Sequence, residues 1–188
     1  MFADVRHKLH ACCHGAHAMI EGLRNLVAAH DITAQNLAAL SIRVNPRWLK
    51  VCDIKAPRTG LEVKFSYVFL AAMVLHHIDT AAYQSYDDSI CGDAGLIATA
   101  SKITVIGDEA ISDGAVNVSA DTQTGVRHTT DFDLMDPIDL SVLGPRLVAK
   151  ASVLIGPARA EKIWESMDDL DSMPAAQMAR CLQPLQNA

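Results

Sequence analysis

The residues best suited to chemistry are concentrated between His7 and His17, near the start of the chain. Histidine or cysteine occupies six of these eleven positions, and Lys8 adds a fixed positive charge. A helix that began here would direct partly positive backbone amides toward a ligand, and a histidine at its start would titrate near neutral pH. Such a set suits a carboxylate substrate, whose negative charge grows when a proton is removed beside the carboxylate.

The same residues permit two other interpretations. Cys13 and His17 are four positions apart and His14 and His17 are three apart, so one side of a helix would present them to a metal ion. No further pair of ligands follows at a spacing typical of zinc sites, so we expect no metal. The remaining interpretation is a chain end with solvated histidine side chains, which composition alone does not reject.

Composition and charge exclude several classes of protein. Half of the 188 residues are apolar and a fifth are charged, which predicts one packed domain, with or without an appended piece. Sixteen basic residues against 22 acidic ones give a net charge of −6, too acidic for electrostatic binding to nucleic acid or an anionic membrane. The longest apolar run, 67–75, is too short to span a membrane, and residues 1–10 lack the pattern of a secretory signal. Five cysteines, an odd number, are expected to be reduced in a cytoplasmic protein.

The positioning elements are predicted from apolar periodicity. A helix is expected to begin near Gly15, followed by a strand over 40–44, a loop over 51–61 and a buried helix over 62–78. Alternating or β-branched stretches predict three more strands, the last two joined by a turn at Thr124 and Gly125: 102–106, 116–119 and 126–130. Strands clustered in the middle of the chain, without regular alternation with helices, predict an α+β fold.

The pattern after Pro137 is purely helical. Asp139 or Ser141 is placed to cap a helix that runs to about Ile155 and stops at Gly156. Two further helices have apolar stripes, formed by Ala160, Ile163, Trp164 and Met167, and by Met178, Cys181, Leu182 and Leu185. The predicted strands offer too little surface for all three helices, so we expect some of these apolar side chains to be exposed and to cause self-association, as in a homodimer.

Three segments of the chain resemble known motifs. Residues 8–17, KLHACCHGAH, are similar to K-x-Y-P-C-C-x-x-T-H, and residues 57–66, PRTGLEVKFS, are similar to P-x-T-x-x-E-A-K-F-S. Residues 147–156 resemble the segment that opens a set of closing helices. The motifs, in this order, are those of the MmgE/PrpD family, which includes 2-methylcitrate dehydratases, cis-aconitate decarboxylases and an iminodisuccinate epimerase.

The resemblance implies both an architecture and an activity. Residues 1–136 would form a small lid domain with helices on a mainly antiparallel sheet, and residues 137–188 would be helices that complete an all-helical domain. Because family members are typically more than twice as long, most of that helical domain would be missing here. The implied activity is dehydration, decarboxylation or epimerisation of a small di- or tricarboxylic acid without a cofactor. The chain alone would be catalytically incomplete: either a helical polypeptide in trans would complete it, or the gene is truncated.

The resemblance also implies roles for individual residues. Lys8 would hold a substrate carboxylate, and His17 would assist proton transfer or bind a second carboxylate. Cys13, His14 and Lys64 are the expected substrate-binding residues. Cys13 also suits a small buried space, and a lysine at a helix start, as expected for Lys64, often extends to water.

Two departures from the family pattern limit what the resemblance implies. Phe69 stands where many relatives have a tyrosine, so a phenolic hydrogen bond to substrate would be lost. His10 and Ala11 replace a Tyr-Pro pair. The resemblance therefore does not predict that this chain acts on the same substrates as its relatives. A non-catalytic binding module of the same fold and a small metal-binding protein are the alternative hypotheses.

Overall fold

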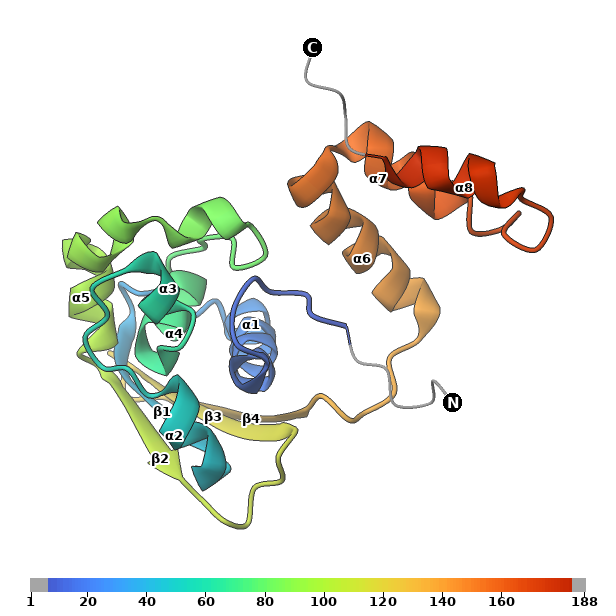
Figure 1. Ribbon diagram of the computed structural model, residues 1–188. Coiled ribbons are helices and arrows are strands. Elements are labelled where there is room, and N and C mark those ends of the chain that lie inside the picture. The colour runs from blue at the N-terminus through green and yellow to red at the C-terminus, as the bar shows by residue number, and fades with distance from the viewer. Residues whose placement is uncertain (1–6, 184–188) are drawn as a thin grey trace. The chain divides into compact units, whose positions relative to one another are not determined.

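The computed structural model describes residues 7–183 (Figure 1). The chain divides into two compact units, one ending at Pro137 and the other beginning at Ile138. The first unit contains a sheet and the helices packed on it, and the second contains three helices. This combination confirms the α+β class predicted from the sequence.

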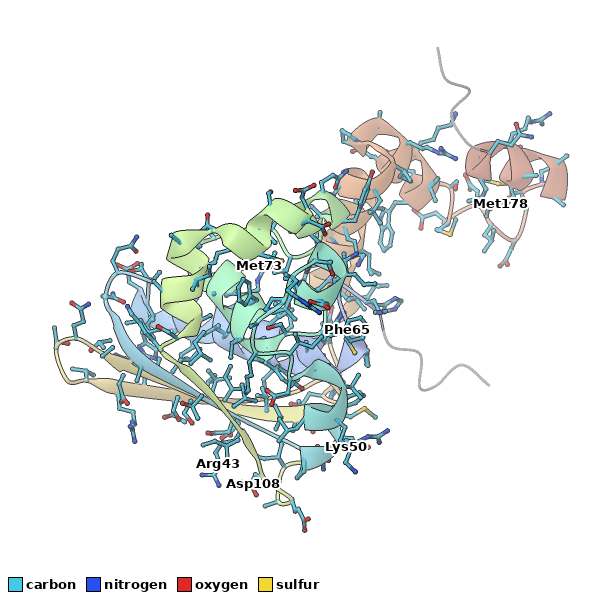
Figure 2. All side chains as sticks on the ribbon, turned by 60° about the vertical axis from the view of Figure 1, so that its left-hand side comes forward. Arg43, Lys50, Phe65, Met73, Asp108 and Met178 are labelled. Atoms are coloured by element: carbon cyan, nitrogen blue, oxygen red, sulfur yellow. The ribbon has the colours of Figure 1, made fainter. Side chains whose placement is uncertain are left out.

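A mixed four-stranded sheet organises the first unit. Its strands lie in the order β2-β1-β3-β4, and β1 pairs with β2 in parallel, whereas the β1–β3 and β3–β4 pairs are antiparallel. The bounds are Leu37–Val44 for β1, Ile103–Gly107 for β2, Ala115–Thr122 for β3 and Arg127–Asp133 for β4. The predicted turn between β3 and β4 is present, and Gly125 adopts there a φ of 81° that glycine tolerates readily. Figure 2 shows Arg43 and Asp108 near one another, where β1 and the end of β2 are linked by an ion pair of 2.7 Å.

Helix α1, His17–His30, packs on β3 and β4. A 3-10 turn, His14–Ala16, leads into it, close to the predicted start. Its buried side contains the apolar residues Met19, Ile20, Leu23 and Leu26. Helix α1 therefore fixes the direction of His17, its first residue, against the core of the unit.

The prediction of a single helix over 62–78 is wrong, because the structure forms two shorter helices there. Helix α3 spans Gly60–Val63, and α4 spans Tyr67–Leu75 with all nine residues buried. Between them Ser66 is extended, and its hydroxyl accepts a hydrogen bond from the backbone N–H of Phe69 at 3.3 Å. Ser66 thus caps α4 and starts a new helix, as serine commonly does.

Several short helices were not anticipated. Helix α2, Leu49–Cys52, enters the predicted loop over 51–61, and α5, Ala94–Ala100, is capped by Asp93. Three 3-10 helices complete the unit: Pro46–Trp48, Tyr83–Tyr86 and Asp88–Gly92. Each of these elements has seven residues or fewer, which is too short for apolar periodicity to reveal.

The second unit contains α6, Leu140–Ile155, α7, Pro157–Glu165, and α8, Ala175–Leu182. As predicted, Asp139 caps α6 and Gly156, with a φ of 87°, ends it. Three residues of the predicted apolar stripes are exposed, namely Trp164, Met167 and Leu182, whereas Leu185 lies outside the described residues. Within residues 7–183, none of the helices has the length and apolar character needed to cross a membrane.

Gly60 is required by a close approach of two backbone segments. A Cβ atom at this position would overlap the carbonyl oxygen of Tyr86, and the Gly60 N–H donates to the Asp88 carboxylate at 2.7 Å. We expect Gly60→Ala to lower the free energy of unfolding by about 2 kcal/mol or more, because the two segments must separate. Gly92→Ala, whose new Cβ meets nothing within 4 Å, should change it by less than about 0.5 kcal/mol. Urea denaturation measures both, and equal losses would contradict the prediction.

Candidate functional site

The segment before α1 is held in place by hydrogen bonds to distant parts of the first unit. The Ala11 N–H donates to the carbonyl of Thr80 at 2.8 Å, and the Cys13 N–H donates to the carbonyl of Lys64 at 3.0 Å. The two acceptors lie after α4 and directly after α3. These contacts position the predicted reactive residues without regular secondary structure in the segment itself.

His10 is the centre of a buried polar network. Its Nε2 lies 2.8 Å from Oε1 of Glu21, and its Nδ1 lies 2.7 Å from Oγ1 of Thr80. The carbonyl of Thr80 also accepts a hydrogen bond from the Tyr86 hydroxyl at 2.9 Å. Sequence reasoning missed Glu21 and Thr80. A signal for Glu21 was available, because a carboxylate on the apolar side of a helix is rarely buried unless it is paired.

His17 is buried beside two other imidazole rings. Its ring centroid lies 5.1 Å from that of His10, in an edge-to-face arrangement, and 5.1 Å from that of His14. The Nε2 atom of His17 is buried and has no hydrogen-bond partner among the described residues. Leaving a buried nitrogen without a hydrogen-bond partner costs free energy. Such unsatisfied groups are found where a side chain has a catalytic role.

The surroundings of His17 keep its ring neutral. Burial lowers its pKa to about 3, and the positive charges of His10, His14 and Lys8 act in the same direction. A hydrogen bond to the backbone of Cys12 opposes the shift. Because Nε2 has no partner, this bond is made through Nδ1, so Nε2 holds the lone pair. Such a ring can accept a proton at Nε2.

His14 and Lys8 share this environment. The His14 ring is half-buried, and its pKa is lowered first by burial and then by the charge of Lys8. Lys8 itself is exposed. The structure thus brings together three of the five predicted site residues, Lys8, His14 and His17, with the cation at the surface and the neutral imidazole beneath it.

Lys64 and Cys13 have different surroundings. Lys64 caps the end of α3 rather than beginning a helix as predicted, and its Nζ lies 5.0 Å from the centre of the Tyr86 ring. Burial raises the pKa of the Cys52 thiol, and a hydrogen bond from this thiol to the Cys13 side chain adds to the shift. Both predicted residues therefore contact the protein interior, and neither of these contacts involves His17.

The metal hypothesis gains no support from the geometry. Cys13 precedes the 3-10 turn, so the helical spacing assumed between Cys13 and His17 does not apply. Over residues 7–183, no group of three or more His, Cys, Asp and Glu side chains is arranged to hold a metal ion.

Phe69, the departure from the family pattern, lines a separate cavity of about 430 Å³. None of the five predicted site residues lines this cavity.

The buried neutral ring of His17 should make stability dependent on pH. Below the ordinary histidine pKa near 6.5 the unfolded chain binds a proton here, whereas the folded chain does not until about pH 3. Stability is therefore lost as the pH falls, by about 2–3 kcal/mol between pH 7.5 and 4.5 from this residue.

The variant His17→Phe should lack that component of the pH dependence in urea unfolding. His128→Phe is the matched control. His128 is half-buried, and its ring stacks on the exposed ring of His30 with 4.0 Å between the ring centroids. This control variant should keep the wild-type pH dependence. An identical dependence in both variants would show that His17 titrates normally.

Comparison with known proteins places these features in a family. The model of the MmgE/PrpD C-terminal domain matches residues 10–135, which is more than half of the chain and almost the whole of the first unit. The match includes His17 and the His10 network and begins two residues after Lys8. A search of curated proteins found no match. The matched range shows that the chain belongs to the MmgE/PrpD family.

Proposed function

We propose that this chain is the C-terminal part of an MmgE/PrpD enzyme that transfers a proton beside a carboxylate of a small di- or tricarboxylic acid. Residues up to 136 would be the lid, and those from 137 onward would complete a helical domain. The observation that supports this most is the buried Nε2 of His17, which has no hydrogen-bond partner among the described residues and lies beside cationic groups. No cofactor is required for this chemistry.

The roles of the residues follow from their charge and protonation. Lys8 binds a substrate carboxylate, and the pKa of the half-buried His14 is lowered by burial and by the charge of Lys8. In dehydration or epimerisation, the C–H bond beside the carboxylate breaks, its proton moves to Nε2 of His17, and its electron pair spreads into the carboxylate. The positive charge of Lys8 stabilises this growing negative charge. In dehydration the electron pair then forms the C=C bond as the C–O bond of the neighbouring carbon breaks, and the hydroxide leaves as water with the proton from His17. In epimerisation the same carbon takes up a proton on its opposite face. In decarboxylation the C–C bond to the carboxylate breaks and CO₂ leaves, and the electron pair that remains on carbon takes a proton that Nε2 of His17 has received from solvent.

The C-terminal helices support the proposal of a helical polypeptide in trans. Large apolar side chains are exposed along this unit, among them Leu140, Val142, Trp164, Leu170 and Leu182. An apolar surface of this kind commonly marks a contact with another polypeptide. We propose that a helical domain covers it, and that the chain self-associates through it when no such partner is present.

A cytoplasmic location is part of the same proposal. All five cysteines are free, and the first unit buries Cys12 and Cys52 without a disulfide. Reduced cysteines are typical of the cytoplasm.

The proposal is tested by mixing the purified chain with the N-terminal helical domain of an MmgE/PrpD protein. Di- and tricarboxylic acids are then assayed for loss of water, loss of CO₂ or inversion. We expect turnover only in the mixture. His17→Asn should lower kcat by about 10²–10⁴-fold, because the proton acceptor is lost. Lys8→Met should raise KM, because a carboxylate contact is lost, and should also lower kcat, because the charge that stabilises the growing negative charge is removed.

Lys50→Met is the matched control, because Lys50 is an exposed lysine on α2 (Figure 2) and outside the histidine cluster. It should leave both constants unchanged. Full activity of His17→Asn would overturn the role of His17. No turnover with any acid in the mixture would favour the non-catalytic binding module, a hypothesis that the burial of His17 also fits.

A further inference from the structure

Glu21 is a carboxylate buried in the apolar side of α1. It is 6 % exposed, and its helix neighbours Met19, Ile20 and Leu23 are fully buried. A buried charge is tolerated only when it is paired and hydrogen-bonded. The partner of Glu21 is Nε2 of His10, at 2.8 Å.

The ring of His10 is fixed at both nitrogens. Nε2 contacts Glu21, and Nδ1 contacts the hydroxyl of Thr80 at 2.7 Å. Thr80 is 1 % exposed, and its carbonyl accepts hydrogen bonds from Ala11 and from Tyr86. A rotation of the imidazole by 180° would place carbon atoms at both contacts, so the network holds the ring in one orientation.

We propose that Glu21 and His10 are positioning residues for His17: Glu21 orients His10, and the His10 ring, edge to face at 5.1 Å, sets the orientation and the charge environment of His17. This inference rests on the role proposed for His17 in proton transfer. It adds a carboxylate and a third imidazole to the site, and neither of them contacts the substrate.

The electrostatic link between the three residues has a sign that can be measured. When protonated, His10 lowers the pKa of His17, as do His14 and Lys8. The negative charge of Glu21 favours the protonated form of His10. Acting directly on His17, the same negative charge would raise its pKa. Removal of the Glu21 charge therefore raises the pKa of His17 if Glu21 acts through His10, and lowers this pKa if Glu21 acts on His17 directly.

The test is an NMR titration of the histidine rings in the full chain and in Glu21→Gln. Glutamine preserves the size of the side chain and a hydrogen-bond acceptor, so a purely structural role predicts no change. We expect the midpoint of His17 to rise by about one pH unit or more, because His10 then lacks the carboxylate that favours its protonated form. His10→Gln tests the link independently and should also raise the midpoint, because the ring cation is removed.

Glu62→Gln is the matched control, since Glu62 accepts a hydrogen bond from the Arg58 N–H at 2.6 Å and is not part of the histidine network. This variant should leave the titration midpoint of His17 unchanged. An unchanged or lowered midpoint in both Glu21→Gln and His10→Gln would overturn the inference. The titration needs neither substrate nor partner. A raised midpoint together with full activity of His17→Asn would therefore reject the proposed function and leave the positioning network standing.

Discussion

The candidate site depends on the anchoring of residues 8–16, which have no regular structure before the 3-10 turn His14–Ala16. Their backbone groups must find partners elsewhere, because buried N–H and C=O groups are costly when unpaired. The hydroxyl of Tyr67, the first residue of α4, donates to the carbonyl of Gly15 at 2.8 Å, and the carbonyl of Lys64 accepts from Cys13 at 3.0 Å. Tyr67 belongs to α4, which is buried along its whole length, so its hydrogen bond ties the segment to the core of the unit.

The sequence predicted the parts of the fold that local patterns determine. The start of α1, the strands, the turn at Gly125 and the cap at Asp139 all follow from periodicity or from residues with one favoured role. The break before α4 was missed because an apolar stretch conceals a single capping serine, Ser66. The site was only partly predictable for a different reason: the contact between His10 and Thr80 joins residues 70 positions apart, and no local pattern reports such a pairing.

The electrostatics of the cluster and the proposed chemistry are connected. The charges that lower the pKa of His17 are cationic, and they come from Lys8, His10 and His14. The positive charge of Lys8 also attracts a carboxylate. Once bound, the carboxylate offsets this charge and favours the protonated imidazole. On this account His17 is a poor base in the free protein and becomes a better one when an anionic substrate is present, which couples proton transfer to binding.

The most direct measurement of this coupling is a citrate titration of the chain, followed through the ring resonances of all histidines. The account predicts that citrate raises the titration midpoint of His17 and shifts His14, while His30 and His128, which stack on one another outside the cluster, stay unchanged. A midpoint of His17 that does not move as citrate increases, or equal shifts at all four histidines, would contradict the account.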